Sequence, residues 1–147
     1  MRLRDVMEPM RHAPCTADVR GSLAAAVASM TAAGRRACVI LDGGMPVGVL
    51  TAADLLRCAR GNDLLLGTPI RQVMTQAPLT AGVDDPALEA ARKMMTRGIH
   101  HLPVMDGASV AGVLPLADLA AAVIEALRAE LLTLEGYIAD LHAARED

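Results

Sequence analysis

Aromatic side chains are almost absent from this 147-residue sequence, which has no Trp, no Phe and a single tyrosine, Tyr137. Proteins that bind single-stranded nucleic acid stack the bases on aromatic rings, so this sequence offers no such surface. The net charge of -3 and the lack of a basic stripe also count against duplex binding. We therefore expect no nucleic-acid partner, and an interior built from Ala, Val, Leu, Ile and Met.

Long apolar runs are missing as well. The first residues, 1–5, lead into no apolar stretch, and the longest apolar segments are too short or too often broken by charge to span a bilayer. We expect a soluble, cytoplasmic protein with no signal peptide and no membrane contact.

Cysteines and catalytic motifs are scarce too. Cys15, Cys38 and Cys58 are odd in number and widely spaced, so reduced, buried thiols without a metal or redox role are expected. The sequence has no serine elbow, no H-E-x-x-H and no P-loop, and its His12 and His142 lie far apart. We expect no catalytic residues and no metal site, and the protein is predicted not to be an enzyme.

What the sequence does contain is an internal repeat. Adding 64 to each residue number carries Gly48-Val49-Leu50 onto Gly112-Val113-Leu114 and Ala53-Asp54-Leu55 onto Ala117-Asp118-Leu119 without a gap. Over residues 10–55 about 17 of roughly 46 positions are identical, far above chance even in an Ala-rich chain. A duplication explains this match, so the chain is expected to fold as two half-size units that pack together.

The most informative stretch runs from Val47 to Leu55, where a strand pattern gives way to a helix pattern. Thr51 followed by Asp54 is typical of a capping box: the Thr oxygen accepts a first-turn amide, and the acid sits at the positive end of the helix dipole. The free amides of a helix start also form an anion site, and a carboxylate beside them can accept hydrogen bonds from sugar hydroxyls. A cap alone and a ligand site are both consistent with this pattern.

Apolar spacing predicts the same order in each unit: strand, helix, strand, strand, helix. After a lead-in over 5–12 that is irregular or a single turn, the segments of the first unit are expected at 13–19, 22–33, 37–41, 47–50 and 51–60. Gly34 is expected to end the first helix in a left-handed conformation, and Asp42-Gly43-Gly44 to form a hairpin turn.

The second unit is expected to use segments 79–81, 85–97, 101–105, 110–114 and 116 onward. Asp85 is predicted to cap its first helix, with Pro86 as the first helical residue. The residues of that helix predicted to face inward are Leu88, Ala91, Met94 and Met95. The predicted boundaries are 5–60 and 70–123 for the two units, 61–69 for a linker in which Leu64-Leu65-Leu66 packs on one unit, and 124–147 for a C-terminal helix.

The pattern resembles a tandem pair of cystathionine β-synthase (CBS) domains, also called a Bateman module, over roughly residues 5–124. The matching residues are Val73-Met74-Thr75, Met94 through Asp106, Val110 through Leu114 and Ala117-Asp118-Leu119, and in the first repeat Met30 through Gly34, Ile40-Leu41-Asp42 and Val47 through Leu55. The resemblance implies an α/β (α+β) fold of two β-α-β-β-α repeats about a pseudo-two-fold axis. It also implies a regulatory module whose clefts bind AMP, ADP, ATP or S-adenosylmethionine, and which often pairs into a disc.

Carried over position by position, the resemblance implies roles for single residues. Thr51 would contact a phosphate or ribose oxygen, and Asp54 would accept the ribose hydroxyls. Thr16 and Ala17 would line the adenine side, and Ala37 to Val39 would offer backbone groups to the base. The equivalent residues of the second cleft would be Thr80, Ala81, His101 to Pro103, and Asp118.

Each repeat departs from the family pattern at one position. Pro115 stands where the first repeat has Thr51, so the second cleft lacks a hydroxyl and an amide donor at the place where a phosphate would be held. Val39 replaces the proline that the second repeat keeps as Pro103, which matters less because the contacts expected there are made by the backbone. We therefore expect one competent site, around Asp54.

The charged residues before the middle strand of each unit could bind the phosphate of a ligand. Arg35 and Arg36 precede this strand in the first repeat, and His100 and His101 in the second. Arginine fits phosphate oxygens, although a solvated position at a helix end would also satisfy both arginines. A metal ion shared by the two histidines is disfavoured because neighbours on a strand point to opposite faces, so one His at a phosphate is expected.

The tail carries a heptad pattern, with apolar residues at alternating spacings of 3 and 4: Ile124, Leu127, Leu131, Leu134, Ile138 and Leu141. Two arrangements fit this pattern: a helix folded back on its own module, and pairing of helices between subunits, which we favour. A parallel pair would set Glu130 against Glu135 of the partner, which is repulsive, whereas an antiparallel pair or a four-helix cluster avoids that contact.

We predict a homodimer, joined through the CBS faces, the 124–141 helix or both, that senses an adenine nucleotide or adenosyl compound and signals to an effector protein. No cofactor is expected beyond this regulatory ligand. The first alternative is a ligand-free interaction module whose clefts are filled by side chains. The second is a subunit of an enzyme whose catalytic domain lies on another chain.

Overall fold

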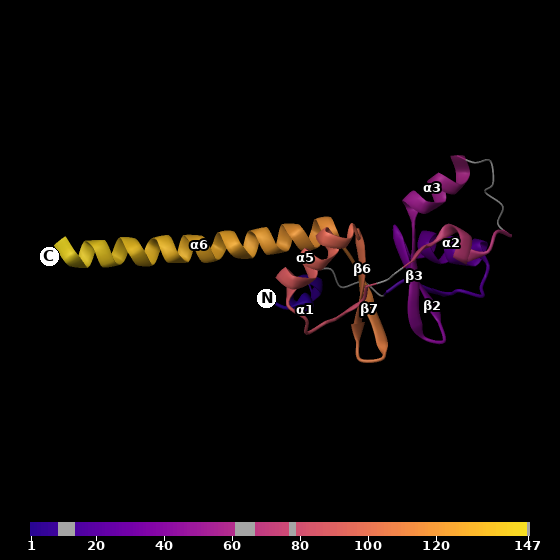
Figure 1. The fold of residues 1–147 in the computed structure, drawn as a ribbon, viewed down its shortest axis with the longest axis horizontal. Coiled ribbons are helices and arrows are strands. Elements are labelled where there is room, and N and C mark those ends of the chain that lie inside the picture. The colour runs from indigo at the N-terminus through magenta and orange to yellow at the C-terminus, as the bar shows by residue number, and fades with distance from the viewer. Residues whose placement is uncertain (9–13, 61–66, 77–78, 147) are drawn as a thin grey trace.

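The computed structural model describes residues 1–8, 14–60, 67–76 and 79–146. The chain forms a mixed α/β fold with two sheets and a long C-terminal helix. One sheet has the strand order β1-β2-β3-β4 and the other β5-β6-β7, and the two sheets lie side by side (Figure 1). The predicted fold class, two α/β units followed by a helix, is confirmed.

The first unit consists of β1 (Thr16–Asp18), α2 (Leu23–Ala33), β2 (Ala37–Asp42), β3 (Met45–Thr51) and α3 (Ala52–Arg60). Strand β1 pairs with β2 in parallel, and β2 pairs with β3 in antiparallel. Helix α2 begins where the Ser22 hydroxyl accepts the Ala25 amide at 3.1 Å. It ends at Gly34, whose φ of 63° favours glycine. The hairpin turns through Gly43 and Gly44, both with positive φ.

The second unit repeats this order with β5 (Ala81–Gly82), α5 (Ala87–Arg97), β6 (His101–Asp106), β7 (Ser109–Pro115) and α6 (Leu116–Glu146). Strand β5 pairs with β6 in parallel, and β6 with β7 in antiparallel. Both hairpins have a register shift, between Ile40 and Leu41 in one and between Val104 and Met105 in the other. These positions are 64 residues apart, so the repeat extends to an irregularity of the backbone.

Three short elements lead into the units: α1 (Leu3–Met7), α4 (Ile70–Val73) and β4 (Thr75–Gln76). They are exchanged between the units. Helix α1 precedes the first unit but packs on the second, where the amides of Leu3 and Arg4 donate to the carbonyls of Asp85 and Val83 at 3.0 and 2.8 Å. Helix α4 and strand β4 precede the second unit but pack on the first, and β4 pairs with β3.

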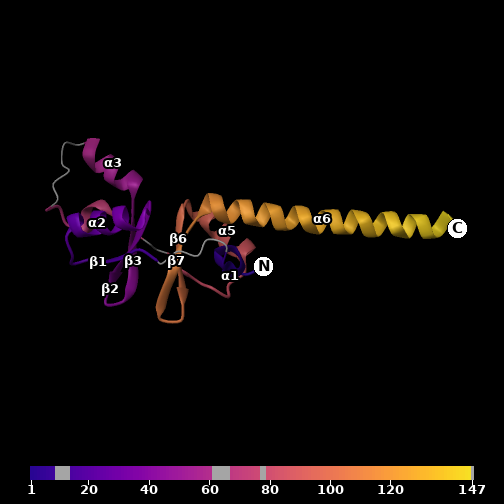
Figure 2. The same ribbon diagram turned by 180° about the vertical axis from the view of Figure 1, so that it is seen from behind.

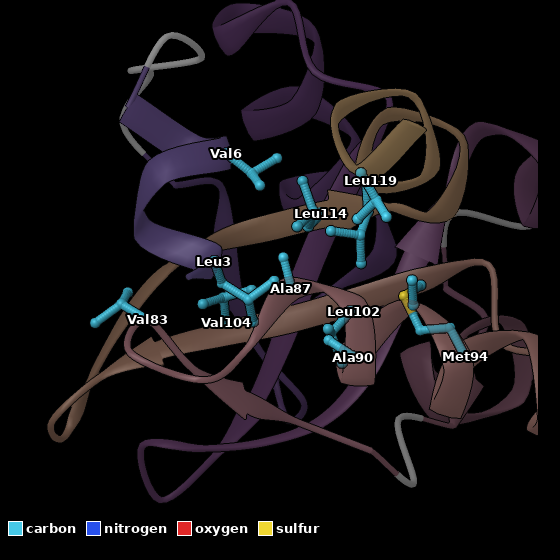
Figure 3. Packing of buried hydrophobic residues seen from close by; sticks show 12 residues of the cluster. Leu3, Val6, Val83, Ala87, Ala90, Met94, Leu102, Val104, Leu114 and Leu119 are labelled. Carbon is cyan, nitrogen blue, oxygen red and sulfur yellow. The ribbon is translucent and has the colours of Figure 1, made fainter. Parts of the chain in front are cut away.

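Each unit has its own buried apolar cluster, completed by the exchanged segment. The cluster of the second unit includes Leu3 and Val6 of α1 together with Leu114 and Leu119 (Figure 3). The cluster of the first unit includes Ile70 of α4. A five-residue helix is not stable alone, so α1 depends on its two buried side chains, each contributing about 1.5–3 kcal/mol.

Helix α6 packs on its unit only at its start. Its buried residues are Leu119 and Val123, and every described residue from Ile124 to Glu146 is exposed. Figures 1 and 2 show the remainder of the helix projecting away from both sheets. The alternative in which the helix folds back on its own module is therefore wrong. Among the described residues, no helix is both long enough and apolar enough to cross a membrane.

Two predictions for α5 are wrong. Pro86, rather than Asp85, is the residue before the helix, and the Asp85 carboxylate instead accepts the Gly82 amide at 2.9 Å, which closes the turn after β5. Leu88 and Met95 are exposed, at 41% and 66%, because the buried stripe follows a neighbouring face. That stripe consists of Ala87, Ala90, Ala91 and Met94.

The packing predicted for Leu64-Leu65-Leu66 lies outside the described residues, as does the end of the predicted lead-in at 9–12.

Candidate ligand-binding site

Thr51 and Asp54 form a capping box where β3 passes into α3. The Thr51 hydroxyl accepts the Asp54 amide at 3.1 Å. In return, Asp54 Oδ2 accepts the amide and the hydroxyl of Thr51, each at 2.9 Å. Both residues are buried, with 8% and 2% of their surface exposed, so the box is shielded from water.

The second carboxylate oxygen of Asp54 is also engaged. Asp54 Oδ1 accepts the Thr75 hydroxyl at 2.9 Å and lies 3.2 Å from Nη1 of Arg57. Thr75 belongs to β4, so this bond joins α3 to the exchanged segment. A sugar hydroxyl would have to displace one of these donors before it could bind Asp54.

Asp118, the equivalent of Asp54 in the second unit, has a different environment. Pro115 stands in place of Thr51, and no capping box forms there, although the Leu116 amide still donates to the His100 carbonyl at 2.8 Å. Asp118 is exposed, and its carboxylate has no hydrogen bond or ion pair with any residue in the described ranges. It is therefore free to accept hydrogen bonds from a ligand.

Asp118 lines a cavity of about 890 Å³ that is bounded by both units and by α1. Small-molecule sites usually enclose about 300–1,000 Å³, so this volume is large enough for a nucleoside with attached groups. The first unit contributes the turn between α2 and β2, and the second contributes the last five residues of β7. The lining residues are Arg4, Met7, Glu8, Pro14, Cys15, Gly34 to Ala37, Val83, His101, Ala111 to Pro115, and Asp118.

The cavity combines cationic and anionic groups from different units. Arg35 and Arg36 come from the first unit, and neither has an ion-pair partner in the part of the chain that the structure describes. Burial, followed by the charge of His100, lowers the pKa of His101, and Asp54 opposes this effect. The imidazole is therefore neutral at pH 7 and can both donate and accept a hydrogen bond. Two free guanidinium groups suit an anionic portion of a ligand.

Cys15 also lines the cavity and lies against Cys38. Burial, and then the hydrogen bond with Cys15, raise the pKa of the Cys38 thiol to about 12. A thiol that stays protonated is a poor nucleophile and a poor metal ligand. Within the described ranges, no three His, Cys, Asp or Glu side chains are close enough to hold a metal ion.

Comparison with known families identifies this arrangement. Residues 3–61 and 70–125 each match the family model of the CBS domain. The chain belongs to the CBS-domain family. Its two units are thus two CBS domains in tandem, as the resemblance of the sequence implied.

Solved structures of CBS domain pairs have the same fold. The pair from protein MJ0100, in complex with 5′-methylthioadenosine and S-adenosyl-L-methionine, is 25% identical with a TM-score of 0.67, over 84% of this chain and 95% of that chain. The CBS domain protein PAE2072 from Pyrobaculum aerophilum, complexed with AMP, is 21% identical with a TM-score of 0.67, over 80% and 89% of the two chains.

A curated relative is much longer than this chain. Protein MJ1404 of Methanocaldococcus jannaschii is 27% identical over an alignment of 113 residues, and the match covers 68% of this chain and 27% of that protein. The CBS domain pair thus spans about a quarter of the relative's length.

The structure brings together five of the ligand residues predicted from the sequence: Arg35, Arg36, Ala37, His101 and Asp118. The others do not line the cavity. Thr80 and Ala81 of the second CBS domain line a separate hollow of about 140 Å³. Val39 and Pro103 are fully buried in their strands. Thr16 and His100 are exposed, Ala17 packs against the core of the first CBS domain, and Thr51 and Asp54 are bound to each other.

Sequence reasoning missed the contribution of α1 to the cavity through Arg4, Met7 and Glu8. A signal was present, because Val6-Met7 matches Val73-Met74 at an offset of 67 rather than 64. In the structure Met7 approaches Gly112, where an added Cβ would lie 3.0 Å from its Cε, and Met74 approaches Gly48 in the same way. The shifted offset therefore marks the segment that each CBS domain exchanges with the other.

Proposed function

We propose that this CBS domain pair is a regulatory module that binds an adenosine-containing small molecule in the cavity lined by Asp118. The observation that carries the proposal is the Asp118 carboxylate, which has no partner among the described residues, in a cavity that also contains Arg35 and Arg36, likewise unpaired there. A carboxylate accepts hydrogen bonds from vicinal ribose hydroxyls, and guanidinium groups bind phosphate or carboxylate oxygens. The 25% identical pair that carries 5′-methylthioadenosine and S-adenosyl-L-methionine supports this ligand class.

The proposed site is the second cleft, whereas the sequence favoured the first. Pro115 does remove a hydroxyl and an amide donor, but Arg35 and Arg36 reach the same cavity from the first CBS domain. At Asp54, by contrast, both carboxylate oxygens are occupied by Thr51, Thr75 and Arg57. We therefore assign ligand binding to Asp118 and a structural role to Asp54.

A ligand in this cavity would contact both CBS domains and α1. Binding would stabilise the arrangement in which these parts lie close together, and would thereby change the surface presented to an effector protein. The role is regulatory rather than catalytic, and the ligand acts as a signal rather than as a cofactor.

Thermal unfolding with AMP, ATP and S-adenosylmethionine, with GTP as a control, tests the proposal. A ligand at about 100 times its dissociation constant adds about 2.7 kcal/mol of stability. We expect Asp118→Asn to abolish this gain, and the matched Asp140→Asn, on the exposed part of the same helix, to keep it. No gain with any adenosine compound would contradict the proposal and favour a ligand-free interaction module. Loss of the gain in Asp54→Asn but not in Asp118→Asn would point to the other cleft.

A further inference from the structure

The exposed part of α6 carries a continuous apolar stripe, which we call the α6 seam. Its members lie on one face of the helix and are between 50% and 63% exposed: Ile124, Leu127, Leu131, Leu134, Ile138 and Leu141. None of them reaches either sheet, because the buried positions of α6 end at Val123. In proteins most helical stability comes from packing of the apolar face, and this face meets only water here, so the apolar stripe needs a cover.

We propose that a second copy of this chain covers the α6 seam, with the two helices antiparallel. The seam is self-complementary in that direction. When residue numbers on facing positions sum to 265, Ile124 faces the partner's Leu141, Leu127 faces the partner's Ile138, and Leu131 faces the partner's Leu134. All six apolar residues are then paired in layers of the kind found in coiled coils, and none is left over.

The charges beside the α6 seam favour the antiparallel direction. In this register the flanking residues meet between the apolar layers, each with the partner's residue on the same side of the seam. On one side Arg128 lies opposite the partner's Glu135, and symmetry repeats this pair. On the other side Glu130 lies near the partner's Tyr137. A parallel pair would instead set Glu130 against the partner's Glu135 twice. Glu135 therefore meets an arginine in the antiparallel direction and a glutamate in the parallel direction.

The surface available is sufficient for a specific dimer. Each half-exposed Leu or Ile still offers on the order of 100 Å² of apolar surface, so the twelve side chains of two copies would bury on the order of 1,200 Å². This value is at the lower end of the range for stable interfaces. The paired segment from Ile124 to Leu141 is about 26 Å long, and the two CBS domain pairs would stand at its opposite ends.

Two leucines at adjacent positions provide a matched test. Leu131 lies in the α6 seam and is 56% exposed, whereas Leu132 is 62% exposed and points to another face. The dissociation constant of the dimer is measured by sedimentation equilibrium. We expect Leu131→Asp to raise it on the order of 100-fold or more, and Leu132→Asp to leave it within about threefold. A monomeric wild-type chain, a tetramer, or a dimer equally insensitive to both changes would overturn the proposal.

The direction of pairing is tested by charge reversal, which leaves the apolar residues in place. Antiparallel helices predict that Glu135→Arg weakens the dimer roughly fivefold, because Arg128 then faces an arginine, and that Arg128→Glu combined with Glu135→Arg restores it. Parallel helices predict the opposite for Glu135→Arg, since Glu130 would gain a cationic partner. A tighter dimer in Glu135→Arg, or no recovery in the double variant, would overturn the antiparallel arrangement.

Discussion

The two repeated aspartates provide the sharpest prediction, because the same substitution should have opposite consequences at the two sites. Asp54→Ala removes a buried carboxylate that accepts three hydrogen bonds of 2.9 Å, from the Thr51 amide and from the hydroxyls of Thr51 and Thr75. Hydrogen bonds to a charged group contribute about 1.5–3 kcal/mol each. The two donors of Thr51 would be left shielded from water, whereas Thr75 is exposed and its hydroxyl can bind water instead, so the Thr51 bonds account for most of the loss. Arg57 adds little because its side chain is 70% exposed.

We therefore expect Asp54→Ala to lower the free energy of unfolding by about 3–4 kcal/mol. Asp118→Ala removes an exposed carboxylate with no partner in the described ranges, and should cost less than about 1 kcal/mol, mainly through the lost interaction with the helix dipole. Urea unfolding followed by circular dichroism measures both values, and a constant dependence on urea shows that the comparison is valid.

Equal losses of stability in the two variants would refute this reasoning. So would a loss below about 1 kcal/mol for Asp54→Ala, because the buried hydrogen bonds would then contribute far less than their burial implies. In either case the contrast between a structural and a ligand-binding aspartate would have no basis.

Two further predictions concern the fold. Because folding lowers the pKa of His101, the unfolded chain binds a proton more readily than the folded one. The stability is therefore fully present above about pH 6.5 and is lost as the pH falls below that value. His101→Gln should reduce this loss of stability in urea melts, and a pH profile that is unchanged in the variant would contradict the prediction. Gly48→Ala should cost about 2 kcal/mol or more, because the new Cβ would lie 2.9 Å from the backbone oxygen of Thr75. Gly112→Ala should change the free energy of unfolding by no more than about 0.5 kcal/mol, because the close neighbour of its new Cβ is the flexible end of the Met7 side chain, at 3.0 Å. Equal losses of stability in the two glycine variants would contradict this difference.

Local rules predicted the elements of each CBS domain well. The left-handed glycine at 34 and the hairpin glycines at 43 and 44 depend on neighbouring residues, and the repeat at an offset of 64 predicted the same order of elements in the second domain; the structure confirms these predictions. The heptad pattern likewise predicted a C-terminal helix after Ile124, which the structure confirms. Apart from the repeat itself, each of these signals lies close in the chain to the structure that it predicts.

The features that could not be predicted depend on contacts between distant segments. Nothing near Asp54 indicates that Thr75, 21 residues later, donates to its carboxylate. Asp85 looked like a helix cap, but its carboxylate accepts the Gly82 amide, while the carbonyl of Met1 accepts the first amide of α5. The contacts made by Thr75 and by Met1 arise from the exchange of leading segments, which the spacing within one repeat does not reveal.

The central claim is that each chain has one ligand site, in the cavity lined by Asp118. Isothermal titration calorimetry with AMP and with S-adenosylmethionine tests it most directly, because it measures stoichiometry as well as affinity. The account predicts one molecule bound per chain with at least one of these compounds, and no binding of that compound by Asp118→Asn. Two molecules per chain, or no binding of either compound by the wild-type protein, would contradict it.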